Sequence, residues 1–193
     1  MVDLKAELWA ALRDGRSRML AKLDGLSEYD RRRPLTPTGT NLLGLVKHLA
    51  GEEYGYLGES FGRPPVERPT WFRDDVSTEV EMWATADESS EYIVSVYRRA
   101  CSHADVTIGE LALESPGRVA HWGDRASSLG ALLILMVRET AAHGGHADIV
   151  RELIDGRIGT PNRKRSDDSD ESANAEIWRR RRAEIQAVAE RFH

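Results

Sequence analysis

The amino-acid sequence predicts an all-α protein built as a four-helix bundle with long connections. Apolar residues recur at helical spacing in four segments, residues 3–25, 41–60, 88–105 and 128–154. Prolines, glycines and capping residues fall between these segments. No segment shows the convincing alternation of a half-buried strand. Amphipathic helices of this kind bury their apolar faces against one another in a bundle.

The first half of the chain contributes two of these helices. The first, residues 3–25, ends before the helix-breaking stretch "YDRRRPLTPTGT". Thr40 is expected to cap the second helix, residues 41–60, which stops at "GRPP". Residues 62–86 are then predicted to form a long irregular connection. A connection of this length in a compact domain is usually functional or packs over another element.

The second half contributes the other two helices. Asp87 is expected to open the third helix, residues 88–105, and a second long connection follows over residues 106–126. Ser127 or Ser128 is expected to cap the fourth helix. Gly156 is a good stop signal for it, because glycine readily takes the left-handed conformation of a helix C-cap. The pattern alone leaves the order of the helices around the bundle open.

The chain is expected to divide into three parts. Residues 1–160 form the bundle, residues 161–172 a polar linker, and residues 173–193 an amphipathic C-terminal helix. The tail contains the basic run "RRRR". We expect this run to be solvated and balanced by the acidic linker, rather than to bind nucleic acid.

Charge and cysteine content limit the classes of function. The net charge of −5 argues against nucleic acid as a partner, because phosphate binding needs a basic face. The single cysteine, Cys101, excludes an intrachain disulfide and fits a reducing cytoplasm. There is no apolar run as long as a membrane span, and no signal peptide is recognisable. We therefore expect a cytoplasmic protein without a nucleic-acid or membrane partner.

Three metal-competent side chains lie at helical spacing in the fourth helix, within "RETAAHGGHADIV". At about 100° per residue, His143 lies about 40° from Glu139, and His146 lies about 20° from it on the other side. Leu132 and Val150 project into the same sector, so we expect the polar stripe at the centre of the buried face. Buried carboxylates and imidazoles need partners, and a divalent cation would satisfy all three groups.

The second helix offers a histidine that would complete such a site. His48 borders the apolar face of this helix, and Glu52 lies one turn further along the same edge. Metal sites in bundles are often built from side chains on facing helices. Spacing alone leaves two other interpretations open, a buried hydrogen-bond network and a chance arrangement.

Several stretches of the chain resemble the DinB superfamily: "NLLGLVKHLAGEEYGYLGESFGRP", "PTWFRDDVSTEVEMWATADESSEYIVSVYRRA", "AHWGDRASSLGALLILMVRETAAH" and "ETAAHGGHADIVRELIDG". The resemblance runs from about Leu8 to Gly159. It is closer to an actinobacterial branch related to S-transferases that depend on mycothiol or bacillithiol. It implies a four-helix bundle in which the helices run up-down-down-up.

The resemblance also implies a set of metal ligands. Members often bind a divalent metal through one histidine of the second helix and two residues four apart on the last helix. These positions are His48, Glu139 and His143, a set similar to that of mycothiol-dependent maleylpyruvate isomerase. His146 and Glu52 are expected to support the site, and His146 could replace Glu139 as a ligand. Zinc is the expected metal, with nickel, manganese and iron as alternatives.

The activity implied is that of a metal-dependent thiol S-transferase, which conjugates a low-molecular-weight thiol to an electrophilic small molecule in detoxification. A metal deprotonates a thiol that it coordinates. The substrate pocket is expected to include Tyr56, Trp71, Trp122 and Arg125. Two alternatives remain, a metal-dependent hydrolase of a small molecule and a non-enzymatic, stress-linked metal-binding protein. A homodimer is expected in each case.

Overall fold

The computed structural model describes residues 2–72, 78–156 and 171–192 of the chain. The chain divides into two compact units, Met1–Thr160 and Pro161–His193, and each is described by itself. The long helices of the first unit are α1 (Leu4–Ala21), α3 (Leu42–Leu57), α4 (Ser90–Glu110) and α5 (Leu129–Asp155). These are the four helices that the sequence predicts, and the all-α fold class is confirmed.

Side-chain caps begin the four long helices. Asp3, Asn41, Ser89 and Ser128 each accept a hydrogen bond from the backbone N–H three residues further on. Gly156 ends α5 in the left-handed region, with φ at 72°. Both limits of α5 therefore follow from local signals that are visible in the sequence.

Two predicted caps were wrong by one or two positions. Asn41 caps α3 in place of Thr40, and Ser89 caps α4 in place of Asp87. The side-chain oxygens of Asn41 and Ser89 are the ones that accept hydrogen bonds from the free N–H groups of the first turn. The short elements of the connections were not predicted: the helix α2 (Glu28–Arg32), the 3-10 helices η1 (Glu59–Phe61), η2 (Thr78–Met82) and η3 (Ala120–Trp122), and the strands β1 (Pro116–Gly117) and β2 (Ser127–Ser128). The two strands pair antiparallel, and strands of two residues are too short to show alternation in a sequence.

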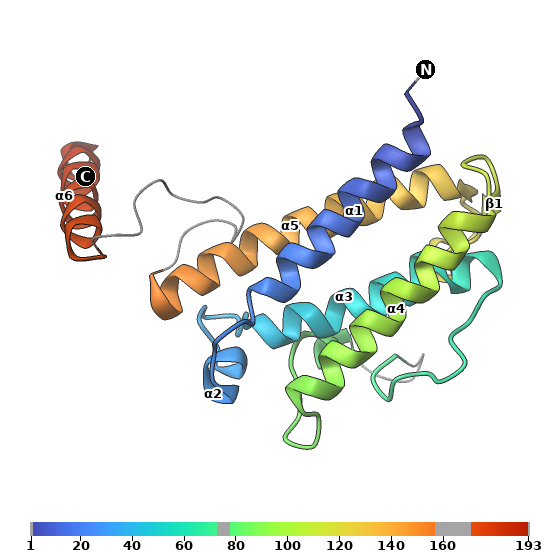
Figure 1. Cartoon of the computed structure of the whole chain (residues 1–193), viewed down its shortest axis with the longest axis horizontal. Helices are drawn as coiled ribbons and strands as arrows, with labels where there is room; N and C mark the ends of the chain where they lie inside the picture. The colour runs from blue at the N-terminus through green and yellow to red at the C-terminus, as the bar shows by residue number, and fades with distance from the viewer. Residues whose placement is uncertain (1, 73–77, 157–170, 193) are drawn as a thin grey trace. The chain divides into compact units, whose positions relative to one another are not determined.

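Helices α3 and α4 lie side by side and run in the same direction (Figure 1). Near the start of both, Lys47 forms an ion pair with Glu88, just before α4. Near the end of α3, the ring of Tyr54 lies 5.5 Å from that of His103. A residue early in α3 thus contacts one just before α4, and a residue late in α3 contacts one late in α4. Only a parallel pair of helices gives this order of contacts.

Helices α1 and α5 form a second parallel pair. Gly15 lies against Thr140, and about two turns further along both helices Lys22 forms an ion pair with Asp148. A Cβ atom on Gly15 would lie 2.9 Å from the Thr140 methyl group, so glycine lets the two helices approach closely. The close approach fixes which residues of α5 face α1.

Helix α1 runs antiparallel to α4. The Lys5 ammonium donates to the Leu111 carbonyl at 2.7 Å, and one guanidinium nitrogen of Arg16 lies 2.6 Å from Asp105. Arg16 also makes a bidentate pair with Glu53 on α3, with both N–O distances at 2.6 Å. The four long helices therefore run up, down, down and up, which is the DinB-type order that the resemblance implies.

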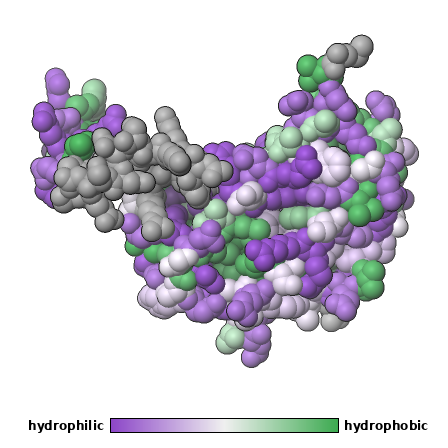
Figure 2. Space-filling model, viewed as in Figure 1, coloured by the Kyte–Doolittle hydropathy of each residue, from purple (hydrophilic) through white to green (hydrophobic). Residues whose placement is uncertain are grey.

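Two apolar clusters fill the bundle on either side of the Arg16 pair. The cluster at the start of α3 and α4 includes Met19, Leu45, Leu49, Ile93 and Val96. The cluster at the other end includes Leu12, Leu57, Ile108, Leu132 and Met136. The outer face in Figure 2 is mostly polar, as expected of a bundle whose apolar side chains are turned inward.

The connection between α3 and α4 is held against α3 by buried contacts. A Cβ atom on Gly44 would lie 1.9 Å from the Met82 carbonyl oxygen, so only glycine admits the connection at this point. The buried Lys47 ammonium donates to the Trp83 carbonyl at 2.9 Å and to Glu88 at 2.8 Å. These contacts hold η2 and the residues after it beside the first half of α3.

The second unit contains α6 (Glu171–Ala189) and the turn η4 (Glu190–Phe192). Its arginine run is exposed, and Arg180 pairs with Glu184 one turn further on. The predicted linker, residues 161–172, lies mostly outside the described residues. Across both units, the part of the chain that is described contains no helix long and apolar enough to span a membrane.

Candidate metal centre

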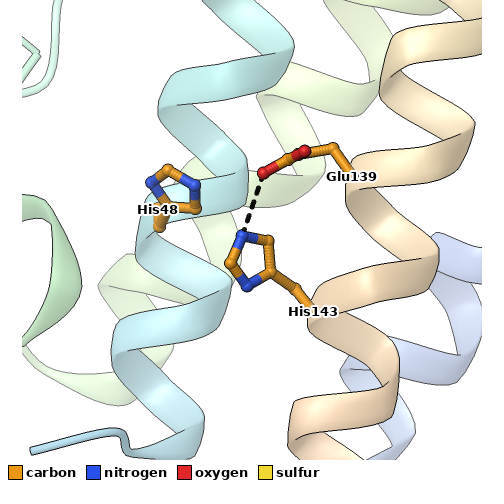
Figure 3. A group of neighbouring side chains, drawn as sticks. All are labelled: His48, Glu139 and His143. Atoms are coloured by element: carbon orange, nitrogen blue, oxygen red, sulfur yellow. Dashed lines mark ion pairs between the residues drawn. The ribbon is translucent and has the colours of Figure 1, made fainter. Parts of the chain in front are cut away.

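Helices α3 and α5 bring three of the predicted site residues together. In Figure 3, His48 projects from α3 toward Glu139 and His143 on α5. The carboxylate of Glu139 lies 3.2 Å from Nε2 of His143, and the two imidazole rings are 4.8 Å apart. One potential ligand atom from each of the three residues lies within 4.8 Å of the others. This separation is small enough for one cation to bridge all three.

The position of the site on α5 differs from the prediction. Glu139 and His143 share one edge of α5 because they are one turn apart. They do not lie at its buried centre, which is near Leu129, Met136, Thr140 and Ala147, roughly 75° round the helix from Glu139 and roughly 35° from His143. Leu132 and Val150, the buried residues nearest to Glu139, mark the edge of this sector. Packing against both α1 and α3 turns this other sector inward. The site consequently lies where the buried face meets the solvent-facing side.

The side chains of the three residues are partly accessible. The exposed fraction of the side chain is 13% for His143, 17% for His48 and 29% for Glu139. Such values are low enough to exclude most water and high enough to leave an approach for a small molecule. A catalytic metal site needs this combination, since one coordination position must stay open.

The unpaired ring nitrogens fit a metal. Nδ1 of His48 and Nδ1 of His143 are buried and have no hydrogen-bond partner among the described residues. A buried nitrogen without a partner is costly, whereas one that coordinates a metal, or that donates to a carboxylate beside the metal, is satisfied. Two imidazoles and a carboxylate also form a donor set that zinc accepts.

Two further carboxylates surround His48. Glu52 lies one turn further along α3, and Glu81 reaches the site from η2, with its Oε2 atom 3.6 Å from Nδ1 of His48. His48, Glu52 and Glu81 also have ligand atoms within 4.8 Å of one another. Glu52 was predicted to support the site. Glu81 was missed, because it lies in a connection without helical periodicity and no local signal ties it to His48.

Burial and mutual repulsion set the charges of these groups. Burial raises the pKa of Glu52 to about 7, with Glu139 and Glu81 adding to the rise and His48 opposing it. Burial by itself lowers the pKa of His48, but the carboxylates of Glu81, Glu52 and Glu139 outweigh it and raise the pKa overall. Burial and the neighbouring His48 ring lower the pKa of His143. Bringing several carboxylates together is unfavourable without a cation.

His146 lies apart from this arrangement. Its residue is exposed, and its ring centroid is 5.5 Å from that of His143. Neither group of potential ligands found among the described residues includes His146. The geometry pairs His143 with Glu139 instead.

An aromatic surface lies next to the site and contains three of the four predicted pocket residues. The ring of Tyr56 lies 5.9 Å from that of Trp122, and the Arg125 guanidinium lies 4.5 Å above Trp122. His121, which was not predicted, lies 6.1 Å from Tyr56. Burial raises the pKa of Tyr56, and the charges of Glu52 and Glu139 add to the rise. Tyr56 is therefore the residue of this surface closest to His48, Glu139 and His143, the metal-competent cluster.

Trp71 is placed differently. It is 1% exposed, with the Lys47 ammonium 4.6 Å from its ring and Tyr92 packed edge-on against it. These contacts make it part of the core that holds the connection to α3 and α4. Within the described ranges, no ring–ring or cation–π contact joins it to Tyr56, Trp122 or His48.

Comparison with known proteins assigns the bundle to a family. Residues 7–156 match the family model described as mycothiol-S-transferase. The fold is similar to that of a conserved protein from Enterococcus faecalis, with a TM-score of 0.59 and 13% identity over 81% of this chain and 100% of that chain. A comparison with curated proteins finds no match.

Proposed function

From the premise that this chain belongs to the mycothiol-S-transferase family, within the DinB-like superfamily, we propose that it is a metal-dependent thiol S-transferase. It joins a low-molecular-weight thiol of the mycothiol type to an electrophilic small molecule. The observation that carries this proposal is the convergence of His48, Glu139 and His143 at the partly open edge of the bundle.

His48, Glu139 and His143 would hold the metal, and the remaining position would accept the thiol. Zinc suits two imidazoles and one carboxylate best, and nickel, manganese or iron would also accept these donors. When bound, the cation stabilises a thiol in its thiolate form at neutral pH. Glu81, beside Nδ1 of His48, would hold the orientation of that ring.

The surrounding side chains would guide the reaction. Glu52 lies beside the site and would take the thiol proton on its carboxylate. The sulfur then attacks the electrophilic carbon, forming a C–S bond, while the leaving group departs with the bonding electron pair. Tyr56 and Trp122 would support an apolar substrate, and Arg125 would bind a carboxylate of the thiol or of the electrophile.

Metal content tests the ligand set. The purified protein should contain one divalent metal per chain by mass spectrometry, and His48→Ala and Glu139→Ala should each lose it. His146→Ala is the matched control, because it removes a neighbouring imidazole that is not in the cluster, and it should retain the metal. Retention by His48→Ala or Glu139→Ala would show that the proposed ligands are wrong.

Activity assays separate the proposed transferase from the alternatives. The metal-loaded protein should consume a halogenated aromatic electrophile only when mycothiol, bacillithiol or glutathione is present. Hydrolysis of ester or amide substrates without any thiol would favour a hydrolase that places water in the open position. A bound metal with neither activity would favour a non-enzymatic metal-binding protein.

We also propose that the protein works as a homodimer in the cytoplasm, as part of the detoxification of electrophiles. The exposed apolar side chains Ile134, Ile149 and Leu153 on α5 give a second copy an apolar surface to cover. Light scattering of the purified protein tests the dimer, which should have twice the chain mass of 21.6 kDa.

A further inference from the structure

A groove of about 560 Å³ lies between α1 and α4. The metal-competent cluster lies on α3 and α5, so the groove is formed by the other pair of long helices. Contacts from Lys5 and Arg16 hold α1 to α4 at one end of this pair. The groove lies toward the end of α1 and the start of α4, where Arg31 of α2 also lines it.

The floor of the groove is apolar. Leu20 lines it from α1, Leu23 from the turn that follows α1, and Val94 from α4. Leu20 and Val94 are only partly buried, so the bundle leaves apolar area uncovered here. The volume lies within the range of about 300–1,000 Å³ that small-molecule sites occupy.

Two arginines that line the groove have guanidinium donors with no hydrogen-bond acceptor among the described residues. Nε of Arg31 is buried without a hydrogen-bond partner, and the guanidinium is 3.6 Å from Glu28 at its nearest ion pair. The Arg98 guanidinium has no hydrogen bond or ion pair with any other described residue. Arg99 differs, because its guanidinium donates to Ser95 at 2.6 Å. The groove therefore offers two guanidinium groups to an anion.

We propose that this groove binds an amphipathic monoanion, an apolar chain or ring that carries one carboxylate. The carboxylate accepts hydrogen bonds from Arg31 and Arg98, and the apolar body covers Leu20, Leu23 and Val94. Asp24 and Glu91 also line the groove and would repel a second negative charge. A single anionic head on an apolar body matches this distribution, and a polyphosphate does not.

Calorimetric titration of the full-length protein tests the site with two carboxylate probes and one neutral probe. Dodecanoate represents an aliphatic acid and 2-naphthoate an aromatic acid, while dodecan-1-ol keeps the apolar chain without the charge. At least one carboxylate should bind at one site per chain, and the alcohol should bind about tenfold more weakly or worse. The stronger of the two acids identifies the shape of the apolar body.

Variants locate the binding. Arg31→Gln and Arg98→Gln should each weaken carboxylate binding about tenfold, with unchanged circular dichroism. Arg182→Gln removes the same charge from the second unit and should bind as the parent does. His143→Ala should also bind normally, because the groove does not use the metal centre. Equal binding of acid and alcohol, loss of binding in His143→Ala, parental binding by both groove variants, or no binding at all would each overturn the proposal.

Discussion

At the scale of single residues, Cys101 shows how the interior limits the chemistry of this protein. The thiol lies on α4 beside Tyr97 and near the Arg16–Glu53 pair. Burial raises the pKa of this thiol well above its usual value, and the Glu53 and Asp105 carboxylates add to the rise while Arg16 opposes it. Thiol reactivity depends on the thiolate, so Cys101 is a poor nucleophile and the proposed reaction does not use it.

We therefore expect Cys101 to react slowly in the folded protein. Dithionitrobenzoate should modify it at least about tenfold more slowly at pH 8 than after denaturation in guanidinium, because burial raises the pKa of the thiol and shields it from the reagent. Because Cys101 is the only cysteine, the colour change reports on it alone. Cys101→Ala should keep its metal and any thiol-transfer activity, and a large loss of activity with the fold intact would contradict this view.

The Arg16–Glu53 pair is a second residue-scale feature, which joins α1 to α3 between the two apolar clusters. Glu53 is fully buried, and Arg16 is 5% exposed. Glu53→Gln removes the buried, bidentate counter-charge of Arg16, whose guanidinium then keeps only the partly exposed Asp105 carboxylate. Glu53→Gln should therefore lower the free energy of unfolding by about 3–5 kcal/mol, measured by urea denaturation. The double variant Arg16→Met with Glu53→Leu should lower the free energy of unfolding much less. A smaller decrease for Glu53→Gln than for the double variant would contradict this prediction.

At the scale of elements, the connection between α3 and α4 brings Glu81 to His48. It can do so because Gly44 leaves room for the Met82 carbonyl and because Lys47 holds Trp83 and Glu88. A carboxylate beside the free nitrogen of a metal-binding imidazole orients the ring and raises its basicity. The connection is therefore part of the candidate site as well as a link between helices.

Glu81→Gln should weaken metal binding about 10- to 100-fold while leaving one metal per chain at saturation. A competition titration with a chelating indicator measures the dissociation constant. Glu152→Gln on the exposed side of α5 removes the same charge without approaching His48, and it should bind metal as the parent does. Equal affinities of the two variants would show that Glu81 does not support His48.

At the scale of the whole molecule, the contacts divide the chain at about residue 160, and the family match ends at residue 156. All residues of the candidate metal centre and both apolar clusters belong to the first unit. A chain of residues 1–160 should therefore fold alone, with the metal content of the full chain and a melting temperature within a few degrees of it. Calorimetry and metal analysis measure both, and an unfolded or metal-free product would show that residues 161–193 are needed.

The sequence by itself determined the four long helices and much of the candidate site. Helical periodicity and capping residues are local properties, so they predict helix positions without knowledge of the fold. The spacing of Glu139 and His143 is local too, since one helical turn brings them together. Local spacing could not link His48 to these two residues, because it lies on another helix. The link was predicted from the apolar face of that helix together with the resemblance to a family.

Only the tertiary structure decided how the helices combine. Helix α5 has apolar residues around much of its circumference, so periodicity did not show that its buried centre lies away from Glu139. The place of Glu81, the burial of Trp71 and the groove between α1 and α4 depend on contacts between segments far apart in the chain. Such contacts depend on which surfaces pack best in three dimensions, and a single sequence contains no local signal for that choice.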